Sequence, residues 1–231
     1  MQDAFDSYQP KILNFGLPRE LSDAVYRENL LVCGELHGVR ENADVAFTLF
    51  QYLGPATLFL ERDESEVGQF LESLKKGEPE FSFIDPDVFR ASVLSLEMAK
   101  IIMILIQSGK ISRIVCVDGD NEATFERDVA RNVMYHMRNE PAIAILGNWH
   151  TEPEIIATDE GQHKSALQYI RETMPKTPLI QYKYLGGSFY NAGSGLQNIA
   201  SRGETNTYNI IRENEVNWGL FIPHATPAWH E

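Results

Sequence analysis

The stretch Leu30-Leu31-Val32-Cys33-Gly34-Glu35-Leu36-His37-Gly38, residues 30–38, decides the fold class. Its first four residues are all apolar and predict a buried strand, because strands covered on both faces read as unbroken apolar runs. Glycines at positions 34 and 38 then predict a tight turn, and this turn carries the polar residues Glu35 and His37. A buried strand that ends in a polar, glycine-flanked loop is typical of the carboxyl end of a parallel strand in an α/β protein.

The same alternation of strand, polar loop and helix continues along the chain. Apolar runs predict further strands at residues 56–61, 111–117, 142–146 and 179–184, and 3.6-residue periodicity predicts helices at 42–53, 64–75, 87–107, 122–138 and 164–173. Alternating strands and helices form βαβ units. The sequence therefore predicts an α/β fold with a mostly parallel sheet flanked by helices on both faces.

The length of 231 residues suits one large domain, residues 1–231. The predicted core covers about residues 30–185. From residue 186 to 231 the composition shifts toward glycine, asparagine and aromatic residues, with short apolar runs at 207–211 and 218–222. We expect this C-terminal segment to form antiparallel edge strands or a cap on the same domain.

The net charge of −13 opposes binding to phosphate backbones and to anionic lipid, so we expect neither nucleic-acid nor membrane partners. Cys33 and Cys116 lie inside apolar runs and form no disulfide framework, which favours a reducing compartment. Residues 1–6 are acidic and carry no secretory pattern, and the longest apolar stretch, 101–106, is too short to span a bilayer. We expect a cytoplasmic protein.

Polar residues follow four of the predicted strands. Glu35 and His37 follow the first, Glu61 ends the second, Asp118 and Asp120 follow the third, and Gly147-Asn148-Trp149-His150 follows the fourth. Ligands bind beyond the carboxyl ends of parallel strands. The sequence therefore predicts one polar active site at this edge.

Glu35 and His37 are separated by one residue, so both side chains point to the same side of the chain. The carboxylate can then orient the imidazole as a general base toward water, or hold it as a metal ligand. Glu61 supplies a second carboxylate, and His150 a second base, acid or ligand. The alternative is that all four groups only hydrogen-bond loop backbone and one another.

Other polar residues leave two interpretations open. Arg127 either pairs with a site carboxylate or anionic substrate, or lies on a solvated helix face. Asp118 and Asp120 either bind a divalent cation or belong to an ordinary turn, which is favoured. The remaining histidines are expected to be structural: His136, His163, His224 and His230.

The motifs resemble one enzyme superfamily. Residues 34–41, Gly-Glu-Leu-His-Gly-Val-Arg-Glu, resemble the Gly-Glu-x-x-His-Gly-x-x-Glu signature of erythromycin-esterase-like proteins, with one residue fewer between Glu and His. That shorter spacing is similar to the Gly-Glu-x-His form of ChaN-like haem-binding lipoproteins. Gly-x-x-His at 34–37 and again at 147–150 resembles the paired motifs of the TraB/TIKI metalloproteases. Glu61 and Arg127-Asp128 also fit, and the resemblance covers about residues 30–151.

This resemblance implies a hydrolase that cleaves an ester or amide bond in a small-molecule substrate. Glu35 would orient His37 to activate water, and Glu61 and His150 would position that water or protonate the leaving group. The remaining candidates are assigned by role: Glu41, Asp118 and Arg127 to substrate binding, and His37, His150 and Glu35 to a divalent metal (manganese, cobalt or zinc) if one is used.

Two other classes remain open. One is a protein that binds haem or another planar ligand against C-terminal aromatic residues, with tyrosine as the haem ligand. The other is a structural or toxin-type domain that kept the motifs without the chemistry. Serine-hydrolase elbows, dinucleotide-binding glycine motifs and P-loops are absent from the sequence, so those classes are disfavoured.

Overall fold

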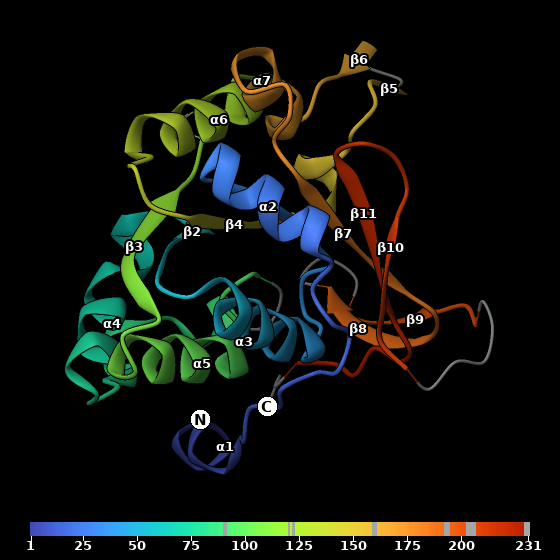
Figure 1. Ribbon diagram of the computed structural model, residues 1–231. Coiled ribbons are helices and arrows are strands. Elements are labelled where there is room, and N and C mark those ends of the chain that lie inside the picture. Colours follow the sequence, from blue (N-terminus) through green and yellow to red (C-terminus); the bar gives the residue numbers. More distant parts are fainter. Residues whose placement is uncertain are drawn as a thin grey trace.

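A seven-stranded sheet forms the centre of the protein (Figure 1). The computed structural model describes residues 1–89, 92–119, 121, 123–158, 161–191, 195–201 and 207–228. The sheet has the order β10-β11-β7-β1-β4-β2-β3, and every neighbouring pair is parallel except β10–β11. Its strands are β1 (Leu31–Glu35), β2 (Ala56–Glu61), β3 (Ile111–Val117), β4 (Ala142–Gly147), β7 (Leu179–Tyr184), β10 (Asn209–Arg212) and β11 (Asn217–Ile222). The predicted α/β fold class is confirmed.

Helices cover both faces of the sheet (Figure 1). One face packs against α1 (Gln2–Ser7), α2 (Arg19–Glu28), α3 (Glu41–Leu53), α4 (Glu64–Lys76) and α5 (Leu96–Gln107), and the other against α6 (Phe125–His136) and α7 (Ala166–Thr173). Leu31 and Cys33 join the first core, whereas Leu30 and Val32 join the second. This two-residue alternation, with apolar residues on both sides, explains why the strand reads as an unbroken apolar run.

The long helix predicted at 87–107 was wrong in its first half. A short 3-10 turn, η2 (Pro86–Phe89), lies there instead, and α5 starts only at Leu96. The Ser95 hydroxyl accepts a hydrogen bond from the Met98 amide at 3.1 Å and caps the helix. A serine that satisfies a free amide in this way fixes a helix start that apolar periodicity alone does not reveal.

The C-terminal segment completes the sheet. β11 is parallel to β7, and β10 forms the antiparallel edge beside it. Two small hairpins stand outside the sheet: β5 (Ile156–Thr158) with β6 (Gly161–His163), and β8 (Gly187–Asn191) with β9 (Gly195–Ile199). The Tyr190 amide donates to the Gly38 carbonyl at 3.3 Å, so the β8–β9 hairpin lies against the loop that follows β1.

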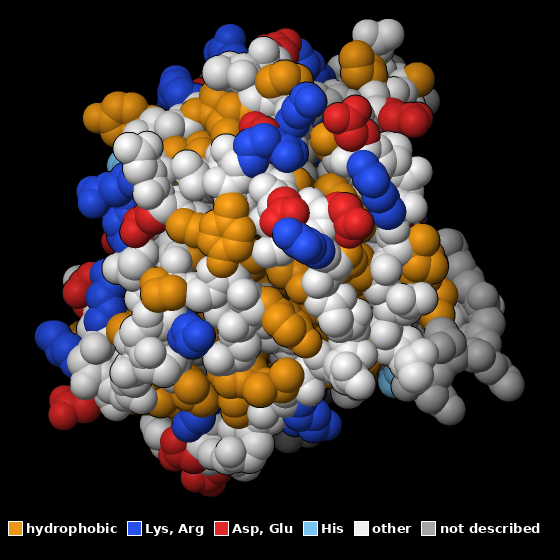
Figure 2. Space-filling model, viewed as in Figure 1, with side chains coloured by type: hydrophobic (Ala, Val, Ile, Leu, Met, Phe, Trp, Pro, Cys, Tyr) orange, Lys and Arg blue, Asp and Glu red, His pale blue; other side chains and the backbone are white. Residues whose placement is uncertain are grey.

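The surface mixes charges of both signs. On the face drawn in Figure 2, Lys and Arg side chains are interspersed with Asp and Glu, so the acidic surplus of the sequence is not gathered there. Among the described residues, no helix has the length and apolar character needed to cross a bilayer.

Candidate active site

The loop after β1 holds an oriented histidine. Glu35, at the end of β1, is only 1% exposed, and its Oε1 accepts a hydrogen bond from His37 Nδ1. The other oxygen, Oε2, accepts from the Asn42 side chain in the first turn of α3. Tyr184 at the end of β7 donates to Asn42 Oδ1 at 2.5 Å. With Nδ1 engaged by Glu35, His37 presents Nε2 to the remainder of the site.

Glu61 brings the second histidine into the same cluster. Its Oε2 accepts from the Gly147 amide at 2.7 Å, which ties the end of β2 to the end of β4. Its Oε1 lies 3.2 Å from His150 Nε2 and 3.8 Å from His37 Nε2. A Cβ at Gly147 would lie 3.2 Å from the His37 ring and 3.4 Å from that of His150, so this glycine lies between the imidazoles. Both imidazoles therefore present Nε2 to one carboxylate oxygen.

A carboxylate that the sequence analysis missed, Glu126, lies behind His150. Glu126 is in the first turn of α6, and its Oε1 accepts from His150 Nδ1 at 2.7 Å. Its Oε2 accepts from the Ala166 amide, the first residue of α7, at 2.8 Å. Acidic residues are common in first turns of helices, so the sequence offered no signal that set Glu126 apart.

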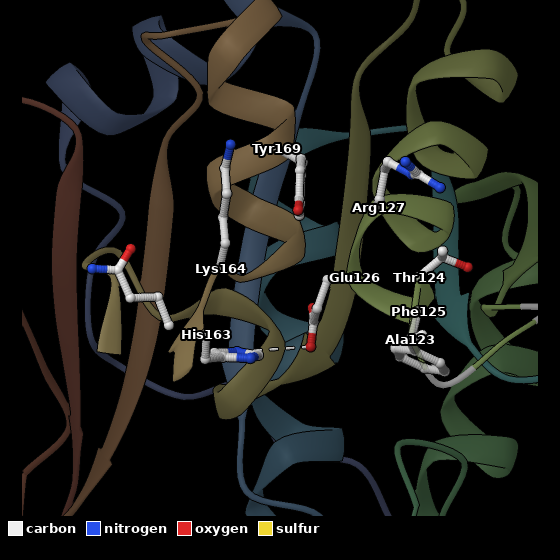
Figure 3. Close-up of a pocket in the computed structure, with 9 residues that line it drawn as sticks. Ala123, Thr124, Phe125, Glu126, Arg127, His163, Lys164 and Tyr169 are labelled. Atoms are coloured by element: carbon white, nitrogen blue, oxygen red, sulfur yellow. Dashed lines mark ion pairs between the residues drawn. The ribbon is translucent and has the colours of Figure 1, made fainter. Parts of the chain in front are cut away.

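His163, which the sequence analysis treated as structural, lies beside this carboxylate. It is the last residue of β6 and points toward Glu126, with Nε2 3.8 Å from Glu126 Oε1 (Figure 3). Its ring also stacks on Trp149 at a centroid distance of 4.2 Å. The structure therefore gives His163 a packing role next to the His150–Glu126 pair.

Carboxylates control the protonation of both imidazoles. Burial alone would lower the pKa of His37, but Glu35 and Glu61 outweigh it and raise the pKa to about 10. Burial is likewise outweighed at His150, where Glu126 and Glu61 raise the pKa to about 10. Burial would raise the pKa of Glu61, but hydrogen bonds from His150 and His37 hold it well below its usual range. At neutral pH the imidazoles are protonated and Glu61 is ionised.

Glu35 behaves differently from Glu61. Burial raises the pKa of Glu35 above its usual value, although the neighbouring His37 opposes the shift. A buried carboxylate needs a partner charge or several hydrogen bonds to remain ionised. Glu35 has both in His37 and Asn42. Glu35 and His37 are therefore coupled, and the protonation of each depends on the charge of the other.

A cavity of about 320 Å³ opens onto these groups. In its wall, the His37 side chain is 32% exposed and that of His150 is 19% exposed, so His37 is the more accessible. The remaining wall is partly aromatic. The cavity is lined by Glu35, Leu36, His37, Gly147, Asn148, Trp149, His150, Phe189, Tyr190 and Asn191.

The structure does not bring the other candidates into this cluster. Glu41 accepts from the Thr226 amide at 2.8 Å and ties α3 to the C-terminal segment. Asp118 accepts from the Gly119 amide at 2.9 Å, as in an ordinary turn. Arg127 lines a separate cavity of about 260 Å³, to which Glu126 and His163 also contribute (Figure 3). Within the described ranges, no carboxylate forms an ion pair with Arg127. Asp120 and His230 lie outside the described residues.

The donor groups available to a metal ion and to haem are placed differently. Over the described part of the chain, no set of three or more His, Cys, Asp and Glu side chains is arranged to hold a metal ion. Tyr182 and Tyr184, candidate haem ligands from the aromatic segment, are 2% and 8% exposed, and Tyr184 already donates to Asn42. These two tyrosines do not fit ligation of haem, whereas Tyr190, from the same aromatic segment, lines the cavity beside His37.

Comparison with known proteins supports the fold. No family model and no curated protein matches the sequence. Among solved structures, a protein from Bacillus cereus superposes with a TM-score of 0.66 at 10% identity, over 100% of this chain and 98% of that one. RRSP, a MARTX toxin effector domain from Vibrio vulnificus, gives 0.42 at 16% identity, over 79% of this chain and 37% of that one. The type III effector HopBA1 gives 0.45 at 13% identity, over 91% and 97%. At these identities, the first likeness shows a shared fold and nothing about activity.

Proposed function

We propose that this protein is a hydrolase of the erythromycin-esterase-like and ChaN-like superfamily that cleaves an ester or amide bond. One observation carries the proposal. Two imidazoles present Nε2 to the same oxygen of Glu61, while a separate carboxylate accepts from each Nδ1. Imidazoles that can accept and donate protons beside a cavity are suited to acid–base catalysis.

The accessibility of the two imidazoles assigns their roles. His37 is the more exposed, so it acts as the base: its Nε2 removes a proton from water, and the water oxygen attacks the carbonyl carbon. His150 stays protonated because Glu126 accepts a hydrogen bond from its Nδ1. It transfers its Nε2 proton to the leaving oxygen or nitrogen as the carbon–heteroatom bond breaks. Glu61 fixes both Nε2 atoms and stabilises the imidazolium.

The pKa values of the two imidazoles predict an alkaline optimum for kcat/KM. Catalysis needs one neutral and one protonated imidazole, and both have a pKa of about 10. The singly protonated form is therefore most populated near that pH. We expect kcat/KM to rise from neutral pH and to pass through a maximum near pH 10.

The substrate in this proposal is a small molecule, in keeping with a cavity of about 320 Å³ and an acidic chain, and the location is cytoplasmic. A divalent metal is not needed for any of the steps above. A chelator separates the two schemes: loss of activity with EDTA and its return with manganese, cobalt or zinc would replace the metal-free scheme.

A panel of p-nitrophenyl esters and anilides tests the proposal. The wild-type chain should accelerate hydrolysis of at least one member, and His37→Ala should lose roughly two to four powers of ten in kcat. His136→Ala, on the far end of α6, is the matched control and should retain full activity. Equal rates for wild type and His37→Ala would overturn the proposal.

A further inference from the structure

A second cavity adjoins the catalytic one. It has a volume of about 430 Å³ and lies over β7 and β11. Leu36 and Asn148 line both cavities, so the two spaces share a wall next to His37 and His150. The β8–β9 hairpin also serves both, because Phe189 of β8 lines the first and Ile199 of β9 lines the second.

Hydrocarbon side chains make up much of the lining of this second cavity, beside the polar side chains of Asn148, Glu152 and Gln181. Leu36, Leu185, Ile199 and Phe221 contribute hydrocarbon, and the ring of Tyr184 joins them because its hydroxyl is already bound to Asn42. Lys183, the one cation in the lining, is paired with Glu213. An anionic ligand would therefore find no free cation there, whereas a neutral hydrocarbon chain would lose no hydrogen bonds on entering.

The side-chain amide of Asn148, at the wall that the two cavities share, lacks hydrogen-bond partners among the described residues. Its Oδ1 is buried without a hydrogen-bond partner, and a Cβ at Gly34 would lie 2.9 Å from it. No acceptor among the described residues takes a hydrogen bond from its Nδ2. An amide held with its oxygen against a glycine and its nitrogen unbonded can donate to a polar group of a ligand that passes between the two cavities.

The geometry points to a substrate longer than the catalytic cavity: an ester or amide with a neutral hydrophobic acyl chain that reaches into the second cavity. The scissile carbonyl lies at His37, its polar atoms face Asn148, and the chain extends over Leu36 into the second cavity. This inference rests on the proposed hydrolase activity for the position of the carbonyl and adds the class of the acyl group. A methylene in a well-fitted apolar pocket improves kcat/KM about tenfold or more, so long esters should be preferred over short ones.

The test compares p-nitrophenyl acetate with p-nitrophenyl octanoate. We expect the wild-type chain to hydrolyse octanoate with a kcat/KM at least tenfold higher than acetate. Ile199→Trp fills the second cavity from a partly exposed strand position and should abolish that preference. Leu196→Trp is the matched control: it lies on the same strand, is 58% exposed and lines neither cavity, so the preference should survive.

A binding measurement tests this inference separately from the proposed hydrolase activity. Calorimetric titration with sodium octanoate and with sodium acetate requires no turnover, and octanoate should bind at least tenfold more tightly to wild type but not to Ile199→Trp. Absence of hydrolysis with a preserved octanoate preference would overturn the hydrolase and keep the acyl site. Equal handling of both chain lengths in wild type, or an unchanged preference in Ile199→Trp, would overturn the acyl site.

Discussion

Each imidazole of the cluster has a carboxylate of its own at Nδ1. Glu35 contributes a charge that keeps His37 protonated and a fixed orientation through Nδ1. Glu126 contributes the same to His150, with the α7 amide of Ala166 on its second oxygen. Because each carboxylate has its own structural anchor, the two imidazoles are held independently and meet only at Glu61.

Glu35→Gln should separate charge from orientation. Glutamine keeps the shape but removes the charge that raises the pKa of His37, so the alkaline rise of the rate should move to lower pH. We expect a smaller loss of kcat at the optimum than in His37→Ala, about tenfold to a hundredfold. The measurement is kcat/KM from pH 6 to 11. A profile that keeps its position would mean that Glu35 does not control His37.

The two cysteines should be unreactive at neutral pH. Burial raises the pKa of Cys33 to about 12, and burial also raises the pKa of Cys116, with Glu64 adding to the shift. Cys116 is less buried than expected, since only Cys33 is fully enclosed. Thiolates react and thiols do not. Labelling by a bulky maleimide should be slow in the native protein and fast in urea; rapid native labelling would contradict this.

The turn η3 (Asn148–Thr151) is the element that places His150. It lies over Gly34 of β1, and a Cβ at Gly34 would come within 2.1 Å of Thr151 Oγ1. Gly34→Ala must therefore displace η3, and we expect a loss of about 1–3 kcal/mol in unfolding free energy with a fall in activity. Urea denaturation and the ester assay measure both.

Gly68→Ala in α4 is the matched control for this element. Its Cβ would meet only the flexible end of Glu64, at 2.9 Å, and alanine is the better residue inside a helix. We expect a gain of up to about 1 kcal/mol and unchanged activity. If Gly34→Ala were equally harmless, η3 would not depend on close contact with β1.

At the level of elements, apolar runs were sufficient to predict β1, β2, β3, β4 and β7, because strands buried on both faces leave an unambiguous pattern. The start of α5 was missed because Ser95 acts through a single capping bond. The α1 and α2 helices were also missed, and β11 was expected at an edge although it lies parallel between β7 and β10. Strand order depends on tertiary packing that local periodicity does not encode.

In the candidate site too, the sequence predicted what the strands position and missed what tertiary packing supplies. Glu35, His37, Glu61 and His150 were identified because they follow strands that share one carboxyl edge. Glu126 was not, because it comes from a helix, and its role depends on how α6 packs beside η3. Sequence spacing locates residues that the sheet positions, whereas partners supplied by packed helices need the structure.

For the molecule as a whole, the cluster links stability to pH. Both histidines have a folded pKa of about 10, above the ordinary 6.5. The folded state therefore holds more protons between these values, and stability falls as pH rises. The contribution is fully present below about pH 6.5 and is lost as pH rises through about 10. Urea midpoints measured from pH 6 to 11 should decline in wild type, with a weaker decline in His150→Gln; parallel declines would contradict this link.

The most direct test of a single shared proton cluster is a double-variant cycle on hydrolysis. His37→Ala, His150→Ala and the double variant are compared with wild type on the best ester of the panel, near pH 10. Residues that act as one unit show strongly non-additive losses. We expect each single variant to lose roughly two to four powers of ten and the double variant to be hardly slower than the slower single one. Losses that multiply, or full activity in either single variant, would contradict a common cluster built around Glu61.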